Sequence, residues 1–379
     1  MRRLVRLLAI TVAVLGVAQA QEGPIKIGFY APLTGPAAED GQSALNGAEV
    51  AVAAINEDGG VLGRPVELVV YDDAFSPDEA ANVTRRLIEQ DDVVAVVSGS
   101  YSFTTRAGAP IAQQAGVPFV AAYAVHPSIT DVGHLVFRMG TLATIQGAAG
   151  AELVANRLGL MRAAVLIVDN DFGTSLSEAF VEQYERLGGE VVMQETYPLG
   201  ESDFRPLISA IRRADPDVIY ATGYFSEAAL FVSQLREAGI DTQVIGQEGY
   251  DSPTFIELAG DAAEGVIITT ELNRDSDREV VQRFLADYLE HAGQPADAVS
   301  ATSHDAVLFV AEAIERAGTT EAEAVAAAMA GITDFEAVSG PIFEFTETRD
   351  AVRPVAIQIV RDGEFHFYDE IDERDLALE

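Results

Sequence analysis

Short apolar runs alternate along the chain with longer segments whose apolar residues recur every three or four positions. Residues 25–30 (IKIGFY) form the first run, which is typical of a strand. Residues 43–56 follow and place Leu45, Ala48 and Val52 on one face of a helix. The same reasoning predicts strands at 66–71, 93–97, 163–168, 190–196, 218–222, 243–246 and from Phe119, and helices at 80–90, 107–115, 145–158, 175–187, 204–214 and 228–238. Strands that alternate with helices form parallel sheets covered on both faces, so the pattern predicts an α/β fold.

The alternation begins again near residue 142, and this restart predicts two doubly wound, Rossmann-like lobes. At 379 residues the chain is also too long for one ordinary core. Three helical patterns follow residue 272, including one at 306–316, and late strands are predicted at 341–345 and 355–360. We expect these late segments to cross back between the lobes. The predicted lobes are then residues 21–142 with about 272–348, and residues 143–271 with about 349–379.

The first 20 residues have the three parts of a secretion signal. Arg2, Arg3 and Arg6 precede an apolar stretch at 7–17, and the small-residue exit Ala18-Gln19-Ala20 ends the segment. No cysteine follows this exit, which excludes attachment through a lipidated N-terminal thiol. No later apolar run is long enough to insert into a bilayer. We therefore interpret residues 1–20 as a signal peptide and predict a periplasmic or secreted protein.

The composition narrows the classes of partner. The chain has 60 acidic and 24 basic residues, with a formal net charge of −36. Such a charge disfavours nucleic acid and anionic membranes as partners and otherwise indicates a well-solvated surface. Cysteine is absent, so two apolar cores must stabilise the protein without disulfides.

Motifs for catalysis are weak or missing. The chain has no G-x-S-x-G elbow, no P-loop and no G-x-G-x-x-G, which mark acyl transfer, nucleotide hydrolysis and dinucleotide binding. Ser303-His304-Asp305 contains the residue types of a catalytic triad, but successive residues of a helix point about 100° apart and cannot relay a proton along one line. The 5 histidines form no i, i+4 pair and thiols are absent, so neither a metal site nor a cofactor is expected.

Ligands of open α/β sheets bind beyond the carboxyl ends of the strands, which directs attention to the loops there. Residues 98–105 (SGSYSFTT) combine hydroxyl groups with the free N–H groups of a helix start, which suits a carboxylate; a plain helix cap is an equal alternative. Glu248, in the glycine-flanked segment 246–250 (GQEGY), could bind an ammonium group or could be a solvated loop acid. Phe172 and Tyr224 follow strands of the second lobe and could close over a small ligand or simply pack that lobe.

A set of short segments spread along the chain carries a resemblance to one known family. They are residues 27–36 (IGFYAPLTGP), Gly41, 46–49 (NGAE), 71–73 (YDD), 172–173 (FG), 203–204 (DF) and 258–265 (LAGDAAEG). Together they resemble the branched-chain amino-acid (Leu/Ile/Val) periplasmic binding proteins, from about residue 25 to the late strands. The resemblance implies a type I periplasmic binding protein fold, in which two Rossmann-like lobes joined by three crossovers close around a ligand.

The resemblance also implies roles for single residues. Ser102 matches the residue whose hydroxyl binds the ligand α-carboxylate, and Glu248 matches the one that accepts the α-ammonium. Ala124 matches a residue that offers its backbone to the ligand. Phe172 and Tyr224 fall where the family has tyrosines that line the second lobe.

Departures from the family pattern bear on the identity of the ligand. Val125 stands where leucine-binding members usually carry Thr, which leaves only its backbone N–H for the ligand, and Phe172 lacks the hydroxyl of a tyrosine. The expected pocket for the ligand side chain is more polar than in amino-acid binders and comprises Asp40, Ser100, Tyr101, Tyr123 and His304. Polar groups around a leucine side chain would be desolvated without partners. An amino acid is therefore expected, but not strict specificity for leucine.

These observations predict the solute-binding component of an ATP-driven (ABC) importer. It would capture an amino acid or a related small amide or carboxylate by hinge closure, act as a monomer, and present its closed form to a membrane permease. A periplasmic sensor that reports the ligand to a receptor or regulator is the alternative. An exported enzyme is the least favoured hypothesis, although one fold can host different functions.

Overall fold

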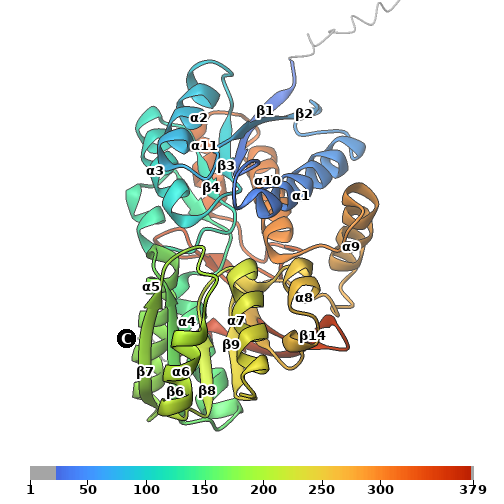
Figure 1. Cartoon of the computed structure of the whole chain (residues 1–379). Coiled ribbons are helices and arrows are strands. Elements are labelled where there is room, and N and C mark those ends of the chain that lie inside the picture. Colours follow the sequence, from blue (N-terminus) through green and yellow to red (C-terminus); the bar gives the residue numbers. More distant parts are fainter. Residues whose placement is uncertain (1–22, 377–379) are drawn as a thin grey trace, which may run out of the picture.

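The computed structural model describes residues 23–376, which form two α/β lobes (Figure 1). The predicted signal peptide lies outside the described residues. The first lobe contains a parallel five-stranded sheet with the strand order β2-β1-β3-β4-β5. Its first part consists of β1 Ile25–Ala31, α1 Ala38–Glu57, β2 Val66–Asp72, α2 Pro77–Glu89, β3 Ala95–Ser98, α3 Ser102–Ala115, β4 Phe119–Ala121, the 3-10 helix η1 Pro127–Val132 and β5 Val136–Arg138.

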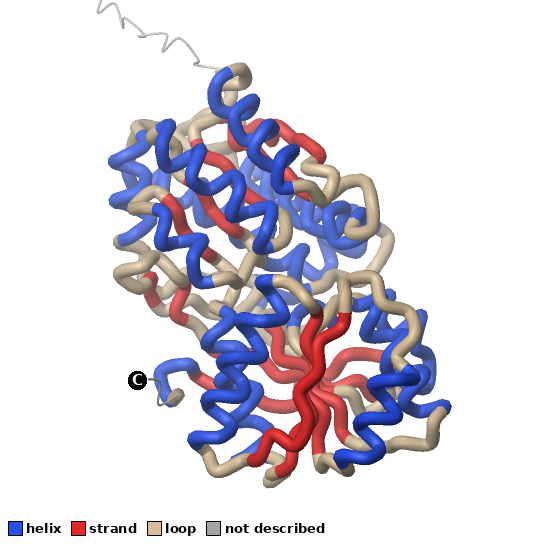
Figure 2. Tube along the Cα trace, turned by 60° about the vertical axis from the view of Figure 1, so that its left-hand side comes forward, coloured by secondary structure: helices blue, strands red, loops and turns tan. Residues whose placement is uncertain are grey.

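The second lobe contains a seven-stranded sheet with the order β14-β13-β10-β9-β8-β6-β7. Its strands are parallel except that β13 runs antiparallel to β10 and to β14. Figure 2 shows these strands between helices on both sides. The elements up to β10 are α4 Ala143–Glu152, the π-helix η2 Leu153–Arg157, β6 Arg162–Val168, α5 Asp171–Arg186, β7 Glu190–Tyr197, α6 Arg205–Ala214, β8 Val218–Ala221, α7 Phe225–Glu237, β9 Gln243–Gly246, η3 Glu248–Tyr250, α8 Pro253–Ala259, η4 Gly260–Ala263 and β10 Ile267–Thr270.

The chain passes between the two sheets at three places, around residues 139–142, 271–278 and 353. After β10 it returns to the first lobe, where α9 and α10 lie beside α1 (Figure 1). It then enters the second sheet as the hairpin of β13 and β14. These late elements are α9 Glu279–Ala292, α10 Ala298–Ala317, α11 Ala322–Ala330, the short paired strands β11 Glu344–Phe345 and β12 Ala351–Val352, then β13 Pro354–Arg361, β14 Glu364–Asp372 and η5 Glu373–Asp375.

Helices pack on both faces of each sheet through buried apolar side chains. In the first lobe, α2 and α3 cover one face and α1, α10 and α11 cover the other. In the second lobe, α4 and α5 cover one face and α6, α7 and α8 the other. Covered on both faces, the central strands read as continuous apolar runs, which is why the sequence pattern identifies them. Within residues 23–376, no helix has the length and apolar character needed to cross a bilayer.

Helices α1 and α10 pack unusually closely, and this contact positions part of the cleft between the lobes. A Cβ atom added to Gly47 of α1 would lie 2.1 Å from the backbone oxygen of Ser300, so only glycine fits there. Next to this contact, Ser43 donates to the Asp297 carboxylate at the start of α10, with Oγ to Oδ1 2.7 Å. Asp40 in the first turn of α1 and Val299 in the first turn of α10 are thereby held at one side of the cleft.

Several helices begin before the first apolar residue of their periodic pattern. Helix α3 starts at Ser102 rather than 107, α5 at Asp171 rather than 175, and α7 at Phe225 rather than 228. The first turn of each contains a single phenylalanine, Phe103, Phe172 or Phe225, among polar or small residues, which is too little to show the spacing of the apolar pattern. The consequence is functional, because Ser102, Phe172 and Tyr224 lie at helix N-termini and not in free loops.

Candidate functional site

A cavity of about 30 Å³ lies between the lobes at the carboxyl ends of their strands. Its walls come from both lobes, and they consist of Asp40, Tyr101, Ser102, Tyr123, Ala124, Phe172, Tyr224, Glu248, Gly249, Asp251, Ser252 and Val299. This volume holds about one or two water molecules. The lobes are therefore closed on each other, and Arg106 of α3 forms an ion pair with Asp171 of α5 across the cleft.

Three helix N-termini meet at this cavity. Ser102 is the first residue of α3, Phe172 is the second residue of α5, and Tyr224 is the N-cap residue of α7. Helix N-termini have unpaired N–H groups and a partial positive charge, which favour an anionic group. Ser102 Oγ accepts a hydrogen bond from the Val125 N–H over 3.3 Å, and the structure gives its own hydroxyl proton no acceptor among the described residues. This hydroxyl can therefore donate to a carboxylate.

Glu248 enters the cavity from the second lobe, just after β9. Its side chain is buried, and neither carboxylate oxygen accepts a hydrogen bond from the described residues. The Gln146 amide lies nearby but donates to Glu271 Oε1, 3.3 Å away. Burial raises the pKa of Glu248 well above its ordinary value, and the Glu271 carboxylate raises it further. A buried carboxylate without a partner is costly, and a cation in the cavity would remove that cost.

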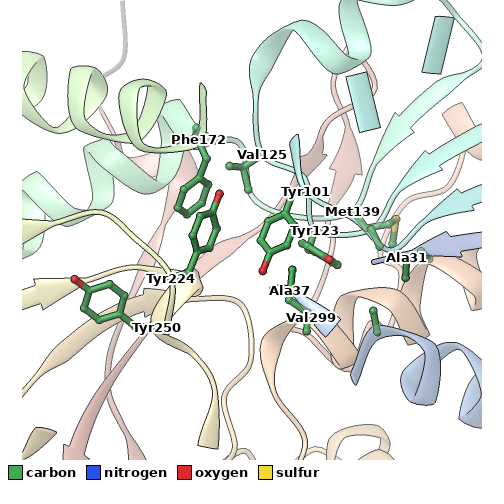
Figure 3. Close-up of a cluster of buried hydrophobic side chains, with 14 of the residues drawn as sticks. Ala31, Ala37, Tyr101, Tyr123, Val125, Met139, Phe172, Tyr224, Tyr250 and Val299 are labelled. Carbon is green, nitrogen blue, oxygen red and sulfur yellow. The ribbon is translucent and has the colours of Figure 1, made fainter. Parts of the chain in front are cut away.

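Four aromatic rings surround the space between Ser102 and Glu248. Tyr101 meets Tyr224 edge-on with ring centroids 4.8 Å apart, and Phe172 stacks on Tyr224 at 5.0 Å. Tyr123 meets the other side of Tyr101 at 5.9 Å. Figure 3 shows these rings converging from the two lobes. Because Tyr101 and Tyr123 belong to the first lobe while Phe172 and Tyr224 belong to the second, opening the lobes would separate the two pairs.

Asp40 supplies a second buried carboxylate to the cavity wall. The Tyr101 hydroxyl donates to its Oδ2. Burial raises the pKa of Asp40 to about 7, although the hydrogen bond from Tyr101 opposes the rise. The charged residues that line the cavity are Asp40, Glu248 and Asp251, and no lysine, arginine or histidine of residues 23–376 joins them. The cavity is therefore an acidic site with aromatic walls.

Eight of the residues singled out in the sequence line this one cavity, namely Asp40, Tyr101, Ser102, Tyr123, Ala124, Phe172, Tyr224 and Glu248. Val125 does not line it, and its N–H binds Ser102 Oγ. Ser100 is also turned away, because its hydroxyl donates to Asp73 Oδ2 over 2.5 Å and pairs with Thr104 at 2.7 Å. The ring of His304 packs on Phe284 with centroids 4.8 Å apart. The structure thus places Ser100 and His304 in supporting positions behind the wall.

Sequence reasoning did not assign four lining residues to the site, namely Gly249, Asp251, Ser252 and Val299. Asp251 Oδ2 accepts from the Thr270 hydroxyl over 2.5 Å, and its carboxylate forms an ion pair with Arg274. Ser252 is the N-cap of α8, with its Oγ accepting from the Thr254 N–H over 3.1 Å, and Pro253 follows. This Ser-Pro pair is a recognisable helix start, so the sequence contained a signal for Ser252.

A buried charged pair lies where the chain crosses between the lobes. Glu271 Oε1, on the second crossing, accepts the Thr141 N–H of the first crossing over 2.9 Å. Arg353, on the third crossing, donates from Nη1 to Met139 O over 3.0 Å. Burial raises the pKa of Glu271, and the Arg353 guanidinium opposes the rise. The three crossings are therefore tied to one another beside the Glu248 carboxylate.

The buried acids predict how stability depends on pH. Burial raises the pKa of Asp40 from 3.8 to about 7 and that of Glu373 from 4.5 to about 7, so the native state binds more protons than the unfolded chain between these values. Their stabilising contribution is complete below the lower pKa and is lost as the pH rises through the higher one. Burial lowers the pKa of His126, which therefore acts in the opposite sense, but it is a single group against two.

We expect ligand-stripped protein to lose at least about 1 kcal/mol of unfolding free energy between pH 5 and 8. Denaturant unfolding at constant ionic strength measures this, and increasing stability over that range would contradict it.

Two doubly wound lobes, three crossings and a closed interlobe cavity define a hinged ligand-binding protein of the type I periplasmic binding protein class. Comparison with known proteins agrees with this class. A family model described as "Periplasmic binding protein" matches residues 24–364. The chain therefore belongs to the periplasmic binding protein family, as the sequence resemblance predicted, and its relatives include Leu/Ile/Val-binding proteins.

Individual relatives show how far the likeness extends. The leucine-, isoleucine-, valine-, threonine-, and alanine-binding protein of Pseudomonas aeruginosa is 33% identical over 318 residues, which is 83% of this chain and 84% of that protein. A leucine binding protein from Thermotoga maritima has a crystal structure that matches with a TM-score of 0.87 and 32% identity over 93% of this chain and 100% of that one. A solute binding protein of an ABC transporter from Rhodopseudomonas palustris, in complex with 3,4-dihydroxy benzoic acid, matches with a TM-score of 0.85 and 27% identity over 92% of this chain and 98% of that one. These relatives are solute-binding proteins, and their ligands include both amino acids and an aromatic acid.

Proposed function

We propose that this protein captures an amino acid between its lobes as the extracytoplasmic binding component of an ABC importer. The observation that carries the proposal is the pairing of Glu248, a buried carboxylate without a hydrogen-bond partner, with Ser102 at the N-terminus of α3 in the same cavity. An α-ammonium would bind Glu248 and an α-carboxylate would bind the Ser102 hydroxyl and the helix terminus. The ligand is held and released unchanged.

The mechanism follows from the two-lobed geometry. In the open form Ser102, Ala124 and Tyr101 of the first lobe receive the ligand carboxylate end. Rotation about the three crossings then brings Phe172, Tyr224 and Glu248 onto the ligand and excludes water. With an amino acid bound, the lobes would stay further apart than in the closed form described above, whose cavity of about 30 Å³ is smaller than an amino acid. The differential contacts of the ligand with the closed form supply the free energy for closure. The closed monomer would present a surface formed by both lobes to its permease.

Relatives that bind aromatic acids define the competing hypothesis for the ligand. The four aromatic rings of the cavity suit a benzoate-like ring. However, an acid without an amino group would leave Glu248 buried and unpaired, and would place a third anion beside Glu248 and Asp40. The electrostatics of the cavity therefore favour a zwitterion or a cation.

A thermal-shift screen of ligand-stripped protein tests the proposal. The compounds are α-amino acids, the matching 2-hydroxy acids, which lack the ammonium, the matching primary amines, which lack the carboxylate, and hydroxybenzoates. A ligand at 100 times its Kd adds about 2.7 kcal/mol of stability, so a true ligand gives a clear shift. We expect stabilisation only by compounds that have both charged groups. Stabilisation by hydroxybenzoates alone would overturn the amino-acid assignment.

A further inference from the structure

The cavity contains one more carboxylate than a simple α-amino acid needs. Glu248 accounts for the α-ammonium, and Asp251 is already neutralised by Arg274 and bound by the Thr270 hydroxyl. Asp40 has no such cationic partner among the described residues that line the cavity. The structure gives its carboxylate one hydrogen bond, from the Tyr101 hydroxyl, and no cationic group in the described chain lines the cavity.

The groups around Asp40 make its isolation more costly. The charged groups that act most strongly on it are Asp297 at the start of α10, Glu39 on its own helix and Glu227 on α7, and all three are acidic. The residue is only 8% exposed, so water provides little compensation. A ligand with an apolar side chain would close the remaining access and leave this carboxylate with a single neutral partner.

The aromatic residues beside Asp40 also favour a cation. Tyr101 contacts Asp40 through its hydroxyl, while its ring lies 4.8 Å from Tyr224 and 5.9 Å from Tyr123 (Figure 3). Aromatic faces attract ammonium and guanidinium groups, and more strongly where water is excluded. A positive group in this corner of the cavity would thus meet a carboxylate, a phenol oxygen and aromatic rings at once.

We infer that Asp40 and Tyr101 form a second recognition point for a positively charged, hydrogen-bond-donating group on the ligand side chain, so that the ligand class is a basic amino acid. This inference rests on the proposed function, because it needs the α-ammonium of the ligand to occupy Glu248. It assigns the specificity to a corner of the cavity where an apolar side chain would be rejected. An Asp40 that merely caps the Tyr101 hydroxyl is the competing explanation.

Matched ligand pairs test the inference by isothermal titration calorimetry on ligand-stripped wild-type protein. L-Ornithine and L-norvaline share one carbon skeleton, as do L-lysine and L-norleucine, and within each pair only the terminal ammonium differs. We expect the cationic member of at least one pair to bind about 10- to 100-fold more tightly, which corresponds to a hydrogen bond to a charged group. Equal or tighter binding of norvaline and norleucine would overturn the inference while leaving the proposed function intact.

The variant Asp40→Asn keeps the size of the side chain and an acceptor for Tyr101, but removes the charge. It should abolish the preference within the pair, because only the cationic member loses a charged partner. The control Glu57→Gln makes the same charge change at the exposed far end of α1 and should keep the preference. A preference that persists in Asp40→Asn would show that Asp40 is only structural. If no amino acid binds to the wild-type protein, the proposed function itself fails and this inference with it. The same holds if amino acids bind but Glu248→Gln leaves their affinity unchanged.

Discussion

Glu248→Gln is expected to lower the affinity for α-amino acids by about 2 to 5 kcal/mol, which is roughly 30-fold or more. The amide has the same size as the carboxylate, but it offers a buried ammonium only a neutral oxygen and no negative charge. The same substitution should leave the ligand-free protein as stable as the wild type or more stable above pH 7, because it removes an acid whose oxygens have no partner among the described residues. Titration calorimetry and denaturant unfolding measure the two effects separately.

The opposite directions of these effects make the test specific. A residue that only supports the fold would lose stability and affinity together. Glu237→Gln is a suitable control, because Glu237 is exposed at the end of α7 and makes the same charge change in the same lobe. An affinity within twofold of the wild type for Glu248→Gln would refute the role assigned to this carboxylate.

Arg138→Met should destabilise the protein by about 3 to 5 kcal/mol, the largest stability effect that we expect from a single substitution. Arg138 is fully buried and its Nε donates to Asp350 Oδ1 over 2.8 Å. Its other nitrogens donate to Ala124 O over 3.2 Å and to His126 O over 2.8 Å. The variant therefore leaves a buried carboxylate unpaired and frees the segment that includes Ala124 of the cavity wall. Urea unfolding measures the loss.

Two comparisons separate the charge effect from the loss of packing. Adding Asp350→Asn to Arg138→Met removes the unpaired charge and should recover part of the lost stability. Arg205→Met breaks an exposed ion pair with Asp203 and should behave like the wild type. A double variant that is no more stable than Arg138→Met alone would show that the buried charge is not the cause.

The alternation of apolar runs and amphipathic segments was sufficient to predict the fold class, because both faces of each sheet are covered by helices. The predicted strand at residues 243–246 matches β9, and that at 66–71 differs from β2 by one residue. The strands β5, β10, β12 and β14 were not predicted. Length alone does not explain the misses, because β10 has 4 residues and so does β9. β14 lies on an edge of its sheet and contains several acidic residues, which weaken the apolar signal of a strand.

The cavity residues were partly accessible to sequence reasoning for a topological reason. Ser102, Phe172, Tyr224 and Glu248 all follow strands, and parallel strands bring their carboxyl ends to one edge. Ser100 lies two residues from Ser102, yet its side chain points to Asp73, because consecutive residues entering a helix diverge in direction. Sequence position therefore could not distinguish the lining residue from its neighbour.

The linear order of apolar and polar residues was enough for the two α/β lobes, since the spacing of the apolar residues within each element already shows whether it is a helix or a strand and which face it buries. The electrostatic character of the cleft depended on contacts between residues far apart in sequence. Asp40 meets Tyr101, Glu248 is left without a partner, and Asp251 is neutralised by Arg274. Whether a carboxylate is paired, solvated or isolated depends on what the folded chain places around it, and in a chain with 60 acidic residues no local pattern reveals that.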